Sequence, residues 1–213
     1  SCSLFSFNYI LPYYFISLFH LFGFSFIASM KIFLITNFIL SGIFMFIFSK
    51  NFFKNNTSAF VSSIFYLFAP YHLISLHFKI TIGEILAFTL IPLFFLSLHK
   101  LYTQKARLYI VLTGFVLGLI FLTHIYVAIM LIPLSFLFTL IYSNSKKIYL
   151  LKLISSLVIG LIISFFQWFP SILYKDYLFT SINPVNINAL YYPSLLDLLY
   201  APWRYGFLFQ GPK

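Results

Sequence analysis

The sequence predicts an all-α fold, a polytopic bundle of about six transmembrane helices. Of its 213 residues, 62% are hydrophobic and only 8% are charged, and the mean hydropathy is +1.02. Soluble domains carry about a quarter charged residues, so too few charges remain here to solvate the outside of a folded domain. The apolar residues also come in runs of about 17 to 25, which is the length that crosses hydrocarbon as a helix. The predicted exterior therefore faces lipid.

Six such runs follow one another, separated by short polar segments. The predicted spans are 31–49, 58–76, 83–99, 107–123, 125–142 and 150–174. Short connections make successive helices antiparallel neighbours. Four prolines within or at the ends of these runs predict kinks, because neighbouring helices can satisfy the freed carbonyl groups.

Two regions flank this predicted bundle of residues 31–174. Residues 1–30 include an apolar stretch, 7–27, that is split by Pro12 and Gly23. This split favours a segment that lies on the outer face or re-enters the membrane over one that crosses it. Residues 175–213 are more polar and predict an outer tail with a short amphipathic helix. The chain begins at Ser1 without the features of a signal peptide, so we expect a signal-anchor helix upstream.

The charges predict how the bundle is oriented. Eight of the thirteen basic residues, and no acid, lie at one end of the alternating spans: Lys50, Lys54, Lys100, Lys105, Arg107, Lys146, Lys147 and Lys152. The other end holds five basic residues and all three acids, Glu84, Asp176 and Asp197. By the positive-inside rule the lysine-rich end faces the cytoplasm. Both ends of the chain are then expected on the extracytoplasmic side.

The net charge of +10 points to membrane lipids rather than to nucleic acid. The basic residues form small clusters between apolar stretches and not a stripe with interleaved polar contacts. Cys2 is the single cysteine, which excludes an internal disulfide and a multi-cysteine metal site.

The first group of candidate functional residues lies where the second predicted span ends and the third begins. Ionisable side chains at membrane depth are costly and need a partner or a function. Tyr71, His72 and Lys79 precede Glu84, which falls in the first turn of the next helix, where the helix dipole favours a carboxylate. Glu84 is then either a helix cap paired with Lys79, or a general base, a metal ligand or a substrate anchor.

Two further groups lie at the same predicted level. His124 stands at the next outer turn, either as an interfacial, hydrogen-bonded residue or as a proton carrier or ligand. In the tail, Asp197, Trp203 and Arg204 either line the rim of a cavity or anchor the chain in the interface.

At these residues the sequence resembles a family of bacterial membrane proteins described as 6-pyruvoyl-tetrahydropterin synthase-related, whose multi-span domain looks like the GT-C glycosyltransferase superfold. The motifs are 11–14 (LPYY), 20–25 (HLFGFS), 66–73 (YLFAPYHL), 83–88 (GEILAF), 122–124 (LTH) and 194–203 (SLLDLLYAPW). Nothing here resembles the soluble pterin enzyme. Lys79 departs from the arginine that is usual in this pattern, and Arg204 from the usual glycine.

The resemblance implies an enzyme that transfers a sugar from a polyprenyl-phosphate donor to an acceptor in an outward cavity of the plasma membrane. The chief acid of such enzymes lies in the first outer loop, which precedes this sequence except for its end. Glu84 matches the second acidic position, where relatives bind a divalent metal or the donor phosphate. His124 is a second candidate catalytic residue. The expected substrate-binding residues are Tyr71, His72, Lys79, Asp197, Trp203 and Arg204.

A different class of function is also compatible with the sequence. A transporter, flippase or lipid-binding scaffold without chemistry predicts polar side chains in the middle of the spans, lining a path through the bilayer. Asn37 and Gln167 are the clearest examples, and both are neutral. This scarcity favours a site at the outer surface over a conduit.

Overall fold

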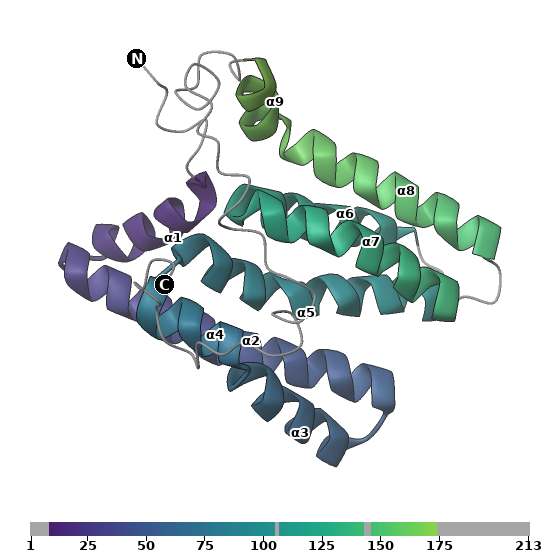
Figure 1. Cartoon of the computed structure of the whole chain (residues 1–213), viewed down its shortest axis with the longest axis horizontal. Coiled ribbons are helices and arrows are strands. Elements are labelled where there is room, and N and C mark those ends of the chain that lie inside the picture. Colours follow the sequence, from purple (N-terminus) through teal and green to yellow (C-terminus); the bar gives the residue numbers. More distant parts are fainter. Residues whose placement is uncertain (1–8, 105–106, 143–145, 174–213) are drawn as a thin grey trace, which may run out of the picture.

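The computed structural model of the chain describes residues 9–104, 107–142 and 146–173, and all of its regular structure there is helical (Figure 1). The order of helices is α1 (Ile10–Leu21), α2 (Phe26–Phe53), α3 (Asn56–Leu67), α4 (Pro70–Ile74), the π-helix η2 (Ser75–Lys79), α5 (Ile82–Thr103), α6 (Leu108–Thr123), α7 (Ile125–Tyr142), α8 (Lys146–Ile163) and α9 (Phe165–Leu173). The all-α prediction is confirmed. The tail 175–213, with Asp197, Trp203 and Arg204, lies outside the described residues.

Three of the described helices are long and apolar enough to cross a membrane, namely α2, α5 and α7. A fourth span results if α3 and residues 70–79 count as one segment, which is bent by 44°. The other two predicted spans are less clear, because α6 has only 16 residues and the 18 residues of α8 include three lysines. The membrane bundle is confirmed, and the number of six spans stays a prediction.

Two predicted spans are interrupted in the structure. The predicted helix 58–76 breaks at Phe68, and Pro70 starts α4 because its fixed φ and missing N–H suit the first turn of a helix. The predicted helix 150–174 breaks at Ser164, between α8 and α9. In contrast, α7 has the bounds that the sequence predicts, and α2 begins earlier than predicted because Ser25 caps it by accepting from the Ala28 N–H.

The core of the bundle lies between α5, α6 and α8. Fully buried side chains from these three helices are Phe94, Leu98, Leu101, Leu117, Ile120 and Leu153. Helix α6 packs closely on α8 because Gly114 and Gly118 face it at the four-residue spacing that lets membrane helices approach. A Cβ on Gly114 would come within 2.6 Å of the Ser156 carbonyl oxygen. This spacing is present in the sequence and indicates which face of α6 is packed.

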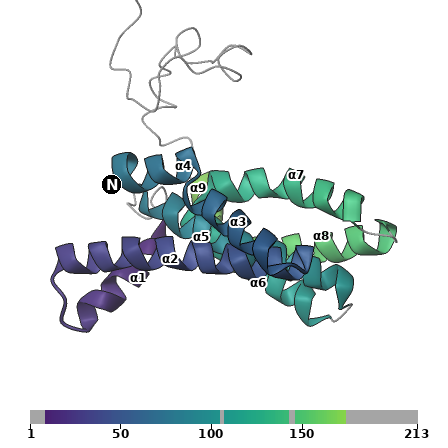
Figure 2. The same cartoon turned by 90° about the horizontal axis from the view of Figure 1, so that it is seen from below.

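The alternating helices place their connections at two opposite ends of the molecule (Figure 1). The C-terminal ends of α2, α5 and α7 lie at one end, and the N-terminal ends of α5 and α7 lie at the other. We call the first the lysine border, after Lys50, Lys54 and Lys100, and the second the Glu84 border. Helix α1, with 12 residues, is too short to cross about 30 Å of hydrocarbon, and it folds back beside the start of α2 (Figure 2).

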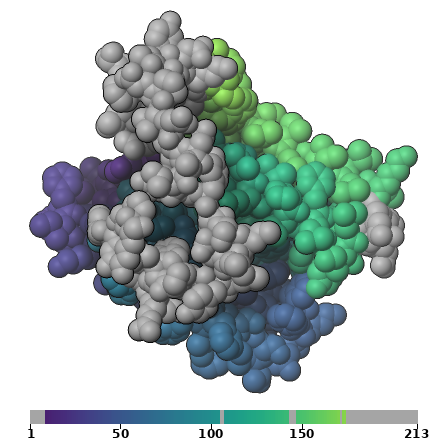
Figure 3. Space-filling view, in the orientation of Figure 1, coloured from purple at the N-terminus to yellow at the C-terminus, as the bar shows by residue number. Residues whose placement is uncertain are grey.

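The outer surface of the described helices is apolar, as a lipid-facing exterior requires. Large side chains such as Ile35, Phe65, Met130 and Ile162 are each more than 60% exposed. In the space-filling view, α8 and α3 form opposite edges of the visible face, and the start of α2 protrudes beside α1 (Figure 3).

Candidate functional site at the Glu84 border

Glu84 lies in the first turn of α5 and is only 8% exposed. A carboxylate buried at the edge of a membrane needs hydrogen-bond donors, and three hydroxyl groups supply them. Ser75 Oγ donates to Glu84 Oε2 at 2.7 Å, Thr81 Oγ1 donates to the same oxygen at 2.9 Å, and Tyr71 Oη donates to Oε1 at 3.3 Å. The N-terminal end of α5 adds the positive end of a helix dipole. The site is therefore built to hold a carboxylate anion.

The backbone before Glu84 adopts two uncommon conformations. Residues 75–79 form a single π-helical turn, a feature that often occurs at functional sites. Ile80 follows with φ +50°, the left-handed region that a β-branched side chain rarely adopts. The Ser75 carbonyl oxygen accepts from the N–H groups of both Ile80 and Thr81, which closes the turn. This turn directs Ser75 and Thr81 at the same carboxylate oxygen.

His124 joins the site from the junction of α6 and α7. Its Nε2 lies 3.7 Å from Glu84 Oε1. Burial lowers the pKa of His124, Glu84 raises it and Lys79 lowers it further, with a net lowering that leaves the ring neutral at pH 7. Nδ1 is buried and has no hydrogen-bond partner. The predicted grouping of Glu84 and His124 at one level is confirmed.

Gly83 allows this close approach of α5 to the end of α6. A Cβ at this position would collide with the carbonyl oxygen of Thr123, the residue before His124. Tyr9 covers the same point, because its ring stacks on His124 with centroids 4.7 Å apart. Burial is the main cause that raises the pKa of Tyr9, so this phenol stays protonated.

The other predicted site residues in the described region have different positions. Lys79 does not form the predicted ion pair with Glu84; its ammonium lies 4.8 Å from the centre of the Tyr71 ring, and Tyr71 in turn contacts Glu84. His72 is 3% exposed, and its Nδ1 bonds to the Tyr66 carbonyl oxygen at 3.1 Å. Its ring packs on Phe88, so the contacts described here keep it apart from the carboxylate.

Sequence reasoning missed Tyr9, Ser75 and Thr81. Thr81 carried a recognisable signal, since Thr-x-x-Glu at 81–84 has the spacing of a capping box. In the structure the Thr81 hydroxyl bonds to the carboxylate of Glu84 and makes no side-chain cap to the backbone. Ser75 and Tyr9 had no such signal, because the π-helical turn and the stacking of Tyr9 on His124 are tertiary features.

The described residues do not form a metal site by themselves. No group of three or more His, Cys, Asp or Glu side chains occurs within them, and Glu84 and His124 offer two ligands. Hydroxyl protons already point at both carboxylate oxygens, as they would at an anion without a bound cation. The divalent metal that the resemblance allowed therefore finds no fit in this part of the chain.

Asn37, one of the two mid-span polar residues that a conduit would use, is paired inside the bundle. The Asn37 Nδ2 donates to the Phe33 carbonyl oxygen at 2.9 Å, and the Thr89 hydroxyl contacts Asn37 Oδ1 at 3.1 Å. Both side chains are buried. Asn37 therefore joins α2 to α5 and does not line a path through the membrane.

Comparison with known proteins identifies one family. Residues 7–206 match the model of the 6-pyruvoyl-tetrahydropterin synthase related domain, which is described as a membrane protein. No curated protein matches the chain. No solved structure matches it either.

Proposed function

We propose that this chain, which belongs to the 6-pyruvoyl-tetrahydropterin synthase-related family of membrane proteins, is a membrane-embedded, GT-C-like glycosyltransferase. It transfers a sugar from a polyprenyl-phosphate donor to an acceptor at the extracytoplasmic face of the bacterial plasma membrane. The observation that carries the proposal is the Glu84 carboxylate, recessed at one border of the bundle beside a neutral histidine. A carboxylate that is ionised and held in one position can accept a proton from a substrate hydroxyl within hydrogen-bond reach.

The arrangement of donors leaves a place for an acceptor hydroxyl. Of the three hydroxyl groups on Glu84, Tyr71 makes the longest bond and its side chain is 51% exposed. An acceptor hydroxyl that replaces Tyr71 donates its proton to Glu84 Oε1 while Ser75 and Thr81 hold the other oxygen. Tyr71 therefore contacts the base and must move away before an acceptor hydroxyl can reach it.

The transfer step balances with these groups. The acceptor oxygen forms a bond to the anomeric carbon, and the bond from that carbon to the phosphate oxygen breaks. The electron pair leaves with the polyprenyl phosphate, and the acceptor proton passes to Glu84. His124, neutral and 3.7 Å away, takes the proton from Glu84 before the next turnover. Lys79, at the same border, offsets the charge of the leaving phosphate.

The position at the membrane border suits a lipid-linked donor. The start of α5 brings Glu84 to the edge of a bundle whose outer surface is apolar. A polyprenyl chain can stay in the bilayer while its phosphate and sugar reach this edge. A site in the middle of the membrane would instead require the charged phosphate to enter hydrocarbon, which costs several kcal/mol.

The test is Glu84→Gln in the full-length protein, reconstituted in liposomes with radiolabelled hexoses on undecaprenyl phosphate. The transfer rate should fall by at least about 100-fold, because general-base catalysis contributes about 10² to 10⁴. Thr89→Val is the matched control: it removes a buried hydroxyl five residues further along α5, and should keep the rate. Transfer at an unchanged rate in folded Glu84→Gln protein would remove Glu84 from the mechanism. Glu84→Asp, which keeps the charge, should retain part of the activity.

A further inference from the structure

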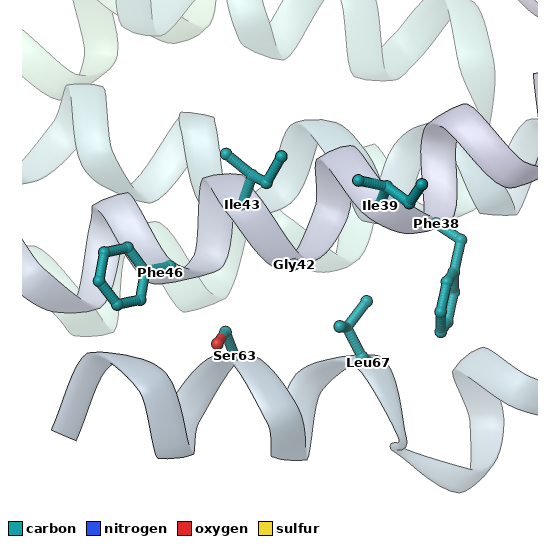
Figure 4. Close-up of a pocket in the computed structure, with 7 residues that line it drawn as sticks. All are labelled: Phe38, Ile39, Gly42, Ile43, Phe46, Ser63 and Leu67. Atoms are coloured by element: carbon teal, nitrogen blue, oxygen red, sulfur yellow. The ribbon is translucent and has the colours of Figure 1, made fainter. Parts of the chain in front are cut away.

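The hairpin of α2 and α3 carries an apolar groove on the outside of the bundle. The groove has a volume of about 360 Å³ and lies between Phe38, Gly42 and Phe46 of α2 and Ser63 and Leu67 of α3. Figure 4 shows Ser63 and Leu67 pointing from α3 toward α2. A Cβ on Gly42 would come within 2.7 Å of Leu67 Cδ1, so glycine allows the Leu67 side chain to pack closely on α2.

A basic pocket follows the groove at the lysine border. It has a volume of about 420 Å³ and is lined by Lys50, Asn51 and Lys54 at the end of α2 and by Asn56 at the start of α3. No acid lines this pocket, and Lys50 and Lys54 are both exposed. Two ammonium groups and two amides together favour an anion with several oxygen atoms, such as a phosphate.

The groove and the basic pocket lie along one face of α2. Ile39, Ile43 and Phe46 of the groove and Lys50 of the pocket follow the 4-3-4 spacing that keeps residues on one side of a helix. Phe46 and Lys50 are one turn apart, a rise of about 6 Å. From Phe46 to Phe38 the groove offers about 12 Å of apolar length at 1.5 Å per residue.

The backbone at Lys54 has a conformation that is uncommon for lysine. Lys54 ends α2 in the left-handed region, with φ +55°. Glycine is the usual residue at such a position because a side chain there is strained. Strain of this kind often persists at positions that serve a ligand.

We propose that this hairpin binds one anionic phospholipid, with an acyl chain in the groove and the headgroup phosphate on Lys50 and Lys54. Charge complementarity selects this occupant: a zwitterionic lipid would bring its own ammonium group to a pocket that holds two. The basic pocket lies at the opposite border from Glu84, and the proposal does not depend on the proposed transferase function. Lipid bound here joins α3, which has only 12 residues, to the long helix α2.

The experiment is a titration of the purified full-length protein in detergent, read by native mass spectrometry. One arm uses phosphatidylglycerol, a second uses phosphatidylcholine with the same acyl chains, and a third adds inorganic phosphate as competitor. We expect one phosphatidylglycerol to bind more tightly than phosphatidylcholine. Equal affinity for the two lipids would overturn the proposal, as would displacement of phosphatidylglycerol by millimolar phosphate, which would indicate a site for the free anion.

Charge variants test the headgroup site. Lys50→Gln/Lys54→Gln should bind phosphatidylglycerol about 30-fold more weakly, since each lysine near a membrane surface contributes about 1 kcal/mol to the attraction of anionic lipid. Lys147→Gln/Lys152→Gln is the matched control, because it removes the same charge from α8. An equal loss in both double variants would show a general effect of net charge and would contradict the site.

A groove variant tests the acyl-chain site separately. Ile43→Trp enlarges a side chain that lines the groove. It should weaken the binding of both phosphatidylglycerol and phosphatidylcholine without changing the preference between them. Ile129→Trp, on the exposed surface of α7, is its control and should change neither. Unchanged lipid affinity in folded Ile43→Trp protein would remove the groove from the proposal.

Discussion

At the Glu84 border a single carboxylate is recessed among hydroxyl groups, whereas at the lysine border Lys50 and Lys54 extend into an open pocket. Within the described residues, each border has one residue other than glycine in the left-handed region, Ile80 at the first and Lys54 at the second. The difference lies in what surrounds each strained turn. Buried partners fix Glu84 in one position, as chemistry on a substrate requires, while the exposed lysines suit a diffusible lipid headgroup.

The largest effect that separates the two borders is expected at Gly83. A Cβ in Gly83→Ala would collide with backbone, the Thr123 carbonyl oxygen, and so α5 must move away from the α6–α7 junction. Overpacking of this kind costs about 1–3 kcal/mol, and the shift separates Glu84 from His124. Thermal unfolding in detergent should show a lower midpoint. An unchanged midpoint in folded Gly83→Ala protein would contradict the close approach of α5 to the Thr123 carbonyl oxygen.

The next effect concerns the hydroxyl groups around Glu84. Ser75→Ala removes the shortest bond to the carboxylate and should lower the free energy of unfolding by about 2 kcal/mol, since bonds to charged groups contribute about 1.5–3 kcal/mol. Ser155→Ala, which removes an exposed hydroxyl bonded within its own helix, should change it little. Chemical denaturation of both variants checks the contrast. Equal effects would contradict a carboxylate that depends on its hydroxyl partners.

At the lysine border, chemical denaturation should instead show a substitution that raises the free energy of unfolding. Lys54→Gly relieves a left-handed side chain and should raise the free energy of unfolding by about 1 kcal/mol. Lys50→Gly, one turn earlier and inside α2, should lower it by about 1 kcal/mol because glycine weakens a helix interior. Comparison of the two variants shows whether the left-handed backbone at residue 54 is strained by its side chain. A loss of stability in Lys54→Gly would contradict it.

The smallest effect is a pH dependence carried by His124. Burial lowers its pKa in the folded state below the value of about 6.5 in the unfolded chain. Between these two pKa values the unfolded chain binds more protons than the folded chain. The contribution of His124 to the free energy of unfolding is therefore fully present above about pH 6.5 and is lost as the pH falls. The thermal midpoint should therefore drop between pH 7.5 and 5.5 by less in His124→Gln than in the parent protein. An identical slope in both would exclude His124 as a contributor.

The sequence was sufficient for the membrane bundle and for the grouping of Glu84 with His124. The apolar runs predicted the bundle, and the alternation of its spans predicted that Glu84 and His124 lie at the same end. Both patterns can be read from composition and spacing alone. It was insufficient where one helix meets another. The break at Phe68 and the π-helical turn at Ser75–Lys79 depend on how the chain packs after Pro70. Of the two alternatives for Glu84, the one that paired it with Lys79 relied on nearness in sequence, whereas the basic side chain that contacts Glu84 in the structure, His124, comes from the end of α6.

The opposition of the two borders across the membrane is the claim on which the rest depends, and cysteine accessibility measures it directly. In a Cys2→Ser background, Lys79→Cys and Lys54→Cys each place one thiol at an exposed lysine position, the first at the Glu84 border and the second at the lysine border. We expect a membrane-impermeant maleimide to label position 79 only from the extracytoplasmic side and position 54 only from the cytoplasmic side. Labelling of both positions from the same side would contradict the account.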